Sequence, residues 1–399
     1  MSETKATRIG RRIAELRKIH GATQVGLAQK ANVSESAIRK IEAGDRAASP
    51  AMVAALARAL NVNITDITEQ PYGAWNASPE SDQAAVPALR QALVEGDDPD
   101  LDVPRRSLAE LRVDVAKLKE WDRRTEHAAV IRALPDLLRH LHRAHNDAST
   151  AESPVAAELL ASTYCFAVIG LYRLGHLDLA HLADERARRL ADRGNDPLRS
   201  ATAEWHHALI LLCDGSYRAG LRAISRAQEV VGEAPDIEAA QALRGALHLR
   251  GSILAARMTD TDLADAYLAD AERLAAPKQE AANYYGTKFG PTNVDIHRVA
   301  VPVEMADGTT AVARAAKIKL PVDTAPSRSG HYWIDLSRGW LLHGDRRRAL
   351  EALNIARGIA PLLTRYHPQV HETVQSLAIS DSRMTVSLAR FAAWCGIRT

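Results

Sequence analysis

Four polar residues lie close together after the helix-breaking pair Gly290-Pro291. They are Asn293, His297, Arg298 and Glu304. Asn293 and His297 are four residues apart, so they share a face if this segment is helical. An amide, an imidazole, a guanidinium and a carboxylate together can hold a small molecule or a peptide through directed hydrogen bonds. The alternative is that these side chains make structural hydrogen bonds between helices.

Histidines and cysteines were considered as metal ligands. The histidines that cluster are His140, His142 and His145, then His206 and His207, and finally His367 and His371. None has a convincing fourth ligand for zinc, so we expect no metal. The three cysteines are far apart and form no CxxC pair, which favours free thiols. The sequence has no nucleophile elbow, phosphate-binding loop or dinucleotide fingerprint, so we expect no enzyme and no cofactor.

The positive charge is concentrated at the N-terminus. Residues 1–70 hold 11 Lys and Arg against 7 Asp and Glu, a net charge of +4, whereas the remainder holds 40 against 42, a net charge of −2. This distribution indicates that only the N-terminus meets a polyanion. Helices are expected throughout, because aromatic residues make up only 5% and the abundant Ala and Leu lose little entropy in a helix.

Closely spaced short helices are predicted over roughly residues 8–67. Apolar spacing and cap residues place them at 8–19, 24–31, 35–42, from Pro50 onward, and at 64–67. Thr23, Ser34 and Ser49 each precede a helix and can cap it. Two helices joined by a short turn suit DNA reading, because the major groove admits one helix while the other braces it.

The stretch LRKIHGATQVGLAQKANVSESAIRKIEAGDRAASPAMVAALARALNV resembles the XRE (Cro/cI-like) family almost end to end. The resemblance rests on LR-x-x-x-G, Q-x-x-LA, V-S-x-x-x-I, E-x-G-x-R and LA-x-AL-x-V, all in order, and covers about 60 residues. It implies a five-helix lambda-repressor-like domain that binds an operator in double-stranded DNA. It also implies that Arg17 and Glu42 form an internal ion pair.

The resemblance assigns DNA contacts to seven residues. These are Gln24, Ser34, Glu35, Ser36, Arg39, Lys40 and Arg46. Gln24 would touch phosphate and base, and Glu35, Ser36 and Arg39 would enter the major groove. There Arg39 can pair with guanine and Glu35 can accept a hydrogen bond from cytosine. Lys40 and Arg46 would approach the sugar-phosphate backbone. The alternative for Arg39 and Arg46 is a solvated surface charge.

A helical repeat follows the N-terminal unit. The residues at tetratricopeptide (TPR) offsets are Trp333, Leu336, Trp340, Gly344, Ala349, Leu353, Ala356 and Pro361. The same spacing from a turn residue to small residues recurs after Gly175, Gly215, Thr259 and Ala306, so the turns are 40, 44, 47 and 38 residues apart. We therefore expect an α-solenoid of degenerate TPR-like hairpins, with an irregular helical bundle as the alternative.

These observations divide the chain into three parts. Residues 1–70 are the XRE-type domain, 71–104 are a Pro-rich and acidic linker with a short helix near 86–94, and 105–399 are the TPR-like domain. No secretory signal is recognised and no apolar run approaches the length of a membrane span, so we expect a cytoplasmic protein that is nucleoid-associated when bound to DNA.

Two functions fit this organisation. The first is a transcription regulator, expected to be a homodimer, whose TPR-like domain senses a small-molecule or peptide effector. The segment around Asn293 also resembles actinobacterial XRE regulators with TPR-like domains, in which the helical domain is regarded as a sensor or interaction domain. The second function is a protein-docking scaffold that its helix-turn-helix head localises to DNA.

Overall fold

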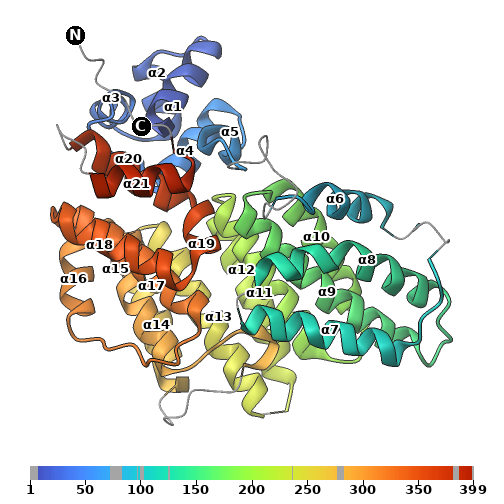
Figure 1. Ribbon diagram of the computed structural model, residues 1–399. Helices are drawn as coiled ribbons and strands as arrows, with labels where there is room; N and C mark the ends of the chain where they lie inside the picture. Colours follow the sequence, from blue (N-terminus) through green and yellow to red (C-terminus); the bar gives the residue numbers. More distant parts are fainter. Residues whose placement is uncertain are drawn as a thin grey trace.

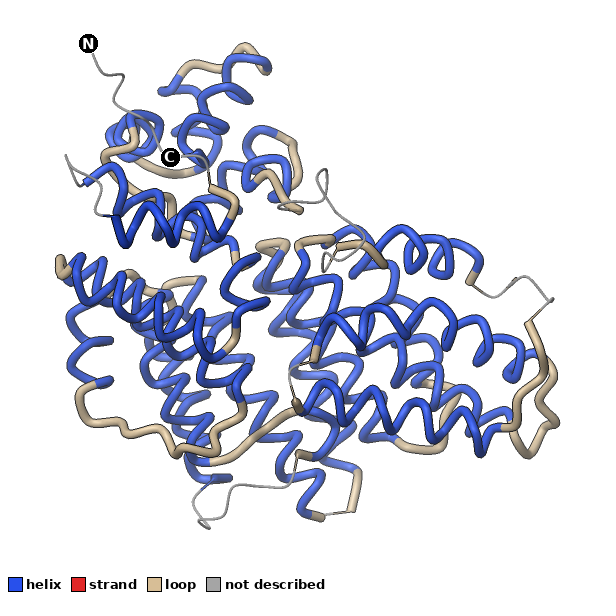
Figure 2. The backbone as a smooth tube through the Cα atoms, viewed as in Figure 1, coloured by secondary structure: helices blue, strands red, loops and turns tan. Residues whose placement is uncertain are grey.

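The structure is a computed structural model that describes residues 8–71, 83–96, 98, 103–124, 126–235, 237–275, 283–380 and 386–397. Every regular element within these ranges is a helix (Figures 1 and 2). The fold is therefore all-α, as the composition predicted.

The N-terminal unit consists of five short helices around one core. They are α1 (Arg8–Ile19), α2 (Gln24–Ala31), α3 (Glu35–Ala43), α4 (Pro50–Leu60) and α5 (Ile64–Thr68). The predicted caps are confirmed: the Thr23 hydroxyl accepts from the amide of Gly26, Ser34 from that of Ala37, and Ser49 from that of Met52. The core consists of Ile13, Leu16, Leu27, Ile38, Ile41, Leu56 and Ile67, among others.

The remaining helices form consecutive antiparallel hairpins. In chain order they are α6 (Val86–Glu95), α7 (Leu108–Arg123), α8 (His127–Asn146), α9 (Ser153–Leu174), α10 (Leu177–Ala191), α11 (Pro197–Cys213), α12 (Tyr217–Glu233), α13 (Glu238–Arg257), α14 (Thr261–Ala275), α15 (Pro291–Glu304), α16 (Gly308–Ala315), α17 (Pro326–His343), α18 (Arg346–Ile359), α19 (Pro361–Tyr366), α20 (Pro368–Ser380) and α21 (Val386–Cys395). A 3₁₀ turn, Tyr284–Gly286, precedes α15. The hairpins α9–α10, α11–α12, α13–α14 and α17–α18 are the most extensively packed helix pairs (Figure 1).

The predicted repeat register is confirmed at its turns. All five predicted turn residues occupy the left-handed region that lets a tight turn reverse the chain: Gly175, Gly215, Thr259, Ala306 and Gly344. The small residues that follow them are buried at the hairpin contacts, including Ala180, Ala227, Ala264, Ala311 and Ala349, all fully shielded from solvent. Because these side chains are small, the two helices of each hairpin can approach closely.

The first helices of the hairpins form one continuous row. Within it, α9 contacts α11, α11 contacts α13, α13 contacts α15, and α15 contacts α17. The second helices, from α10 to α18, contact the row from its outer side and make few contacts with one another. Residues that face away from the second helices therefore line the inside of the array.

The helix boundaries test two further predictions, the short helix in the linker and the absence of an apolar run of membrane-span length. The helix expected near 86–94 is α6, and its residues Val86, Leu89 and Leu93 are buried against α8 and α10, while most of the surrounding 71–104 stretch lies outside the described residues. The expectation that no apolar run reaches membrane-span length was wrong for α9, which passes that test by length and composition. It is apolar because 61% of the stretch is buried inside the fold, where it packs on α8 and α10.

The N-terminal unit, α1–α5, docks on the helical array, and two hydrogen bonds between them join residues distant in the sequence. The guanidinium of Arg58 in α4 donates to the carbonyl of Gly215, 3.1 Å away in the α11–α12 turn. The amide of Arg8 at the start of α1 donates to the side-chain oxygen of Gln375 in α20, at 3.2 Å. Figure 1 shows α1–α5 above α20 and α21. The α3–α4 loop thus lies over the inside of the array.

Candidate DNA interface and candidate ligand cavity

The predicted base-reading residues lie on the exposed side of α3. Ser36, Arg39 and Lys40 are exposed, and the side chains of Arg39 and Glu35 retain 64% and 43% of their accessible surface. Arg39 and Glu35 form an ion pair one helical turn apart. Their exposure leaves both groups able to exchange this weak surface pair for base edges.

The predicted ion pair between Arg17 and Glu42 is confirmed. The Arg17 guanidinium makes two hydrogen bonds to the Glu42 carboxylate, at 2.6 and 2.8 Å, and thereby ties α1 to α3. Burial alone would raise the pKa of Glu42, but the hydrogen bonds from Arg17 and Gln24 outweigh it and lower the pKa. These two charged residues therefore hold α3 against α1.

Gln24 and Arg46 lie next to structural features that the sequence did not indicate. The side-chain amide of Gln24 donates to Glu42 at 2.9 Å, so Gln24 belongs to the network that fixes α3. Arg46 is exposed, but it stands in the α3–α4 loop, which forms one wall of a large cavity. The loop therefore belongs to the N-terminal unit and to the cavity at once.

The cavity has a volume of about 520 Å³, which suits a ligand of drug-like size. Its lining comes from the α3–α4 loop, from α20, and from the first helices α9, α11, α13, α15 and α17. The second helices of these hairpins contribute almost nothing to it. This is the concave inside of the array.

Three of the four polar residues predicted for a ligand site line this cavity: Asn293, His297 and Glu304. Asn293 is buried, its nitrogen donates to the carbonyl of Lys288, and its side-chain oxygen has no partner among the described residues. His297 lies 2.8 Å through Nδ1 from the Asn293 carbonyl. Burial lowers the pKa of His297 to about 3, so its ring is neutral and Nδ1 donates that hydrogen bond.

Arg298 does not line the cavity. Its guanidinium forms ion pairs with Asp295, at 2.8 Å, and with Glu272 in α14. Arg298 therefore holds α15 against α14. For this residue the prediction of a ligand contact was wrong, and the alternative, a structural contact between helices, is confirmed.

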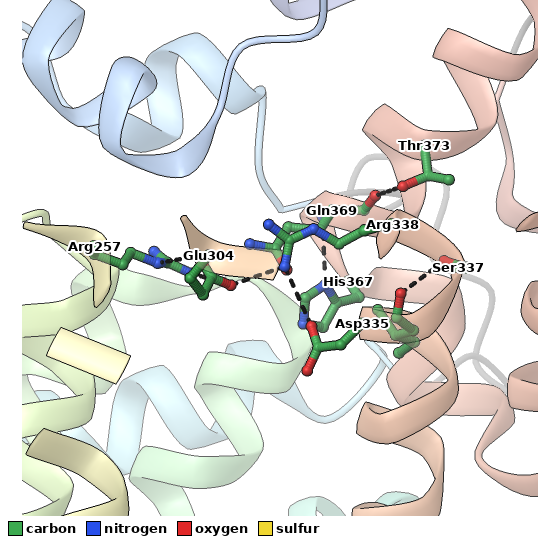
Figure 3. Close-up of polar contacts among 9 residues, drawn as sticks. Arg257, Glu304, Asp335, Ser337, Arg338, His367, Gln369 and Thr373 are labelled. Carbon is green, nitrogen blue, oxygen red and sulfur yellow. Dashed lines mark hydrogen bonds and ion pairs between the residues drawn. The ribbon is translucent and has the colours of Figure 1, made fainter. Parts of the chain in front are cut away.

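Glu304 lies at the centre of an ion-pair network on the cavity wall (Figure 3). Its carboxylate accepts from Arg257 in α13 at 2.7 Å and from Arg338 in α17 at 2.8 Å. Arg338 also contacts Asp335 at 3.2 Å. Burial alone would raise the pKa of Glu304, but the two cations lower it to about 2. One carboxylate thus connects three consecutive hairpins.

Other cavity residues were missed by the sequence analysis. On α17 they are Arg328, His331, Asp335 and Arg338, and on α13 they are Arg250 and Arg257. Their spacings of three, four and seven residues place them on one face of each helix. These residues could have been identified from the sequence, because polar residues recur at helical spacing within the first helix of the hairpin.

Glu372 in α20 lies where the cavity meets the N-terminal unit. It is 8% exposed, and neither carboxylate oxygen has a hydrogen-bonding partner among the described side chains. Burial raises its pKa to about 7, while the backbone of Ala48 in the α3–α4 loop opposes the shift. Asp45 and Arg46 from that loop and His367 line the same cavity. Burial therefore favours the protonated form of Glu372 beside the α3–α4 loop.

We expect Glu372→Gln to flatten the dependence of stability on pH. Because the pKa of Glu372 is higher in the folded protein, its contribution to stability is complete below pH 4.5 and is lost as the pH rises through about 7. The wild type should lose about 2–3 kcal/mol more unfolding free energy than the variant between these limits. Urea unfolding at several pH values measures the difference, and parallel profiles for the two proteins would contradict it.

One comparison with known proteins agrees with the N-terminal assignment. Residues 13–67 match the family model HTH_3, described as Helix-turn-helix. A solved structure, that of Bacillus thuringiensis PlcR in complex with the peptide PapR7 and DNA, is similar at 13% sequence identity with a TM-score of 0.28, over 67% of this chain and 94% of that chain. No curated protein matches the chain. The N-terminal unit is a helix-turn-helix DNA-binding domain.

Proposed function

We propose that the protein is a cytoplasmic, one-component transcription regulator that binds an operator as a homodimer and responds to a small-molecule or peptide effector. Residues 1–70 would bind DNA, 71–104 would link the units, and 105–399 would sense the effector. The observation that carries this proposal is the cavity whose wall belongs to both the DNA-binding unit and the helical array. A ligand in that cavity would touch the part of the protein that binds DNA.

The mechanism follows from this shared wall. A ligand that fits the cavity better in one position of the α3–α4 loop shifts the population towards that position. The loop connects the reading helix α3 to α4, and α4 is docked on Gly215 through Arg58. In a homodimer, the shift would therefore change the orientation of one α3 relative to the α3 of the partner. This would change the spacing between the two DNA half-sites that the dimer can bind.

A docking scaffold is the weaker candidate. A docking protein should expose a contiguous apolar patch. The exposed large apolar side chains come instead from separate elements, for example Ile19 in α1, Val113 in α7, Ile237 before α13 and Val386 in α21. The cavity, with a few convergent polar side chains in its wall, supports sensing.

Two substitutions in the DNA-binding unit test the DNA-binding part of the proposal. Arg39→Ala should weaken binding to the preferred sequence by about 1–3 kcal/mol and relax the preference at one base pair, since Arg39 is placed for base readout. Arg46→Ala should weaken binding on all sequences about equally and lower the slope of log affinity against log salt by about one. Fluorescence anisotropy with labelled duplexes over a range of salt measures both effects.

Arg347→Ala is the matched control, because its side chain is 73% exposed in α18, on the helical array. It removes the same charge and should leave DNA affinity and salt dependence unchanged. If Arg39→Ala and Arg46→Ala both bind every duplex as the wild type does, the assignment of the DNA interface is wrong.

A further inference from the structure

Two arginines in the cavity lack the partners that the other cavity arginines have. Arg257 and Arg338 share Glu304, and Arg173 contacts Asp122 at 3.2 Å. Among the described residues, by contrast, neither Arg250 nor Arg328 has a carboxylate within ion-pair distance. The Nε atom of each is buried and has no hydrogen-bond acceptor in the described part of the chain.

The two guanidinium groups belong to one cationic region of the cavity wall. Burial, together with the nearby cations Arg250 and Arg173, lowers the pKa of Arg328 to about 10. Burial also lowers the pKa of Arg250. Both side chains stay charged near neutral pH, because arginine does not lose its proton there. The desolvation of these two charges therefore outweighs the attractions that they receive, which for Arg328 include that of Asp122.

An uncompensated buried cation is costly, so it points to a group that arrives from outside the chain. The remaining carboxylates of the cavity do not serve this purpose. Glu304 and Asp335 are engaged by Arg257 and Arg338. Glu372 lies at the α20 wall, beside the backbone of Ala48, and Asp45 is exposed in the α3–α4 loop. A bound oxyanion would complete the site, because guanidinium groups match carboxylate and phosphate geometry in bidentate fashion.

The cavity around these arginines is otherwise largely apolar. Its lining includes Tyr172, Trp205, Leu209, Leu249, Ile253 and Ile296. The guanidinium of Arg250 lies 5.1 Å from the centre of the Trp205 ring, which orients it over the apolar floor. The chemistry of the lining therefore favours a ligand with one charged end and an apolar body.

We propose that the cavity binds an amphiphilic organic anion, whose oxyanion is held by Arg250 and Arg328 and whose apolar body lies against Trp205 and the neighbouring aliphatic side chains. This rests on the proposed sensor function and names the class of its effector. A free organic acid and the C-terminal carboxylate of a short apolar peptide share this chemistry.

The test compares two fluorescent probes that share an apolar body and differ in charge. Anilinonaphthalenesulfonate carries a sulfonate, whereas phenylnaphthylamine is the same aromatic system without it. The full-length wild type should bind the anionic probe about tenfold or more tightly than the neutral one, as expected for charge-assisted hydrogen bonds. Arg250→Met and Arg328→Met should each reduce this preference, and the double variant should abolish it.

Controls separate the cavity from other binding sites. Arg347→Met removes an exposed charge in α18 and should leave the preference unchanged. Each Met variant should also unfold at a temperature equal to or above that of the wild type, because it removes an uncompensated buried cation. A lower unfolding temperature would mean that the arginine stabilises the empty fold, and this would contradict the proposal.

Competition identifies the source of the oxyanion. Decanoate should displace the anionic probe more effectively than decanol does. Acetyl-leucyl-leucyl-phenylalanine with a free carboxylate should likewise displace the probe more effectively than its C-terminal amide does. If decanoate competes more strongly than the peptide acid, the effector is an organic acid; if the peptide acid competes more strongly, the effector is a peptide. Equal binding of both probes to the wild type, or an unchanged preference in the double variant, would overturn the proposal. Because the readout involves no DNA, its failure is distinct from a failure of the proposed regulator function.

Discussion

Glu304→Ala is expected to lower the free energy of unfolding by about 3–5 kcal/mol, because it leaves two buried cations without their shared partner. The side chains of Arg257, Glu304 and Arg338 are 15%, 6% and 12% exposed, so solvent screens the two cations only weakly once the carboxylate is gone. The loss should grow to its full size above about pH 4.5 and vanish below about pH 2, since the Glu304 pKa is depressed in the folded state. Urea unfolding of the full-length chain measures it.

Glu272→Ala is the matched control for this variant. Glu272 pairs with Arg298 but is 56% exposed, so its removal should cost no more than about 1 kcal/mol. Replacing all three members of the network, by Arg257→Met, Glu304→Leu and Arg338→Met together, should recover most of the lost stability. A loss below about 1 kcal/mol for Glu304→Ala would contradict the claim that this carboxylate holds three hairpins together.

Glu42→Ala is expected to have a comparable effect confined to the DNA-binding unit. It leaves Arg17, whose side chain is 12% exposed, without its bidentate partner, and it removes the acceptor that Gln24 uses. We expect a loss of about 3–5 kcal/mol in the stability of this unit. Hydrogen exchange measured by mass spectrometry should show faster exchange in α1–α4 and unchanged exchange in α9–α18.

Glu15→Ala serves as the control here, because its side chain is 47% exposed and its pairs with Arg11 and Arg12 lie on the surface. Glu15→Ala should change the free energy of opening, as measured by hydrogen exchange, by at most about 0.5 kcal/mol. The double variant Arg17→Met with Glu42→Met should exchange more slowly than Glu42→Ala alone. If Glu42→Ala exchanges like the wild type, the ion pair does not hold α1 to α3.

The DNA-binding unit was predictable because its signals are local. Thr23, Ser34 and Ser49 mark helix starts through hydrogen bonds to residues three positions along, and Gly44 ends α3 in the left-handed conformation. The hairpin turns were predictable for the same reason. A residue at Gly175, Gly215 or Gly344 must reverse the chain within a few positions, whatever the rest of the molecule does.

The cavity was predictable only in part, because it depends on which helices meet. Asn293 and Glu304 were found within one segment, but Arg250 and Arg328 come from other hairpins, and only the curvature of the array brings them together. The docking of the α3–α4 loop over this space has no local signal at all. It results from contacts between residues as distant in sequence as Arg8 and Gln375.

Arg298 could have been excluded from the cavity by helical geometry. At about 100° per residue, Arg298 lies about 140° around α15 from Asn293, whereas His297 and Glu304 lie within about 40° of it. The structure accordingly directs Arg298 to Asp295 and Glu272 and places the other three at the cavity. The helical period thus separates residues that proximity in sequence groups together.

The most direct test of the central claim is the selection of fragmented genomic DNA by the purified full-length chain, followed by sequencing of the bound fragments. We predict an enriched motif with two half-sites about one helical turn, or a whole number of turns, apart. The Arg39→Ala variant should enrich a motif that is degenerate at one position of each half-site. Bound fragments without a shared motif, or the same motif for both proteins, would contradict the account of α3 as the reading helix.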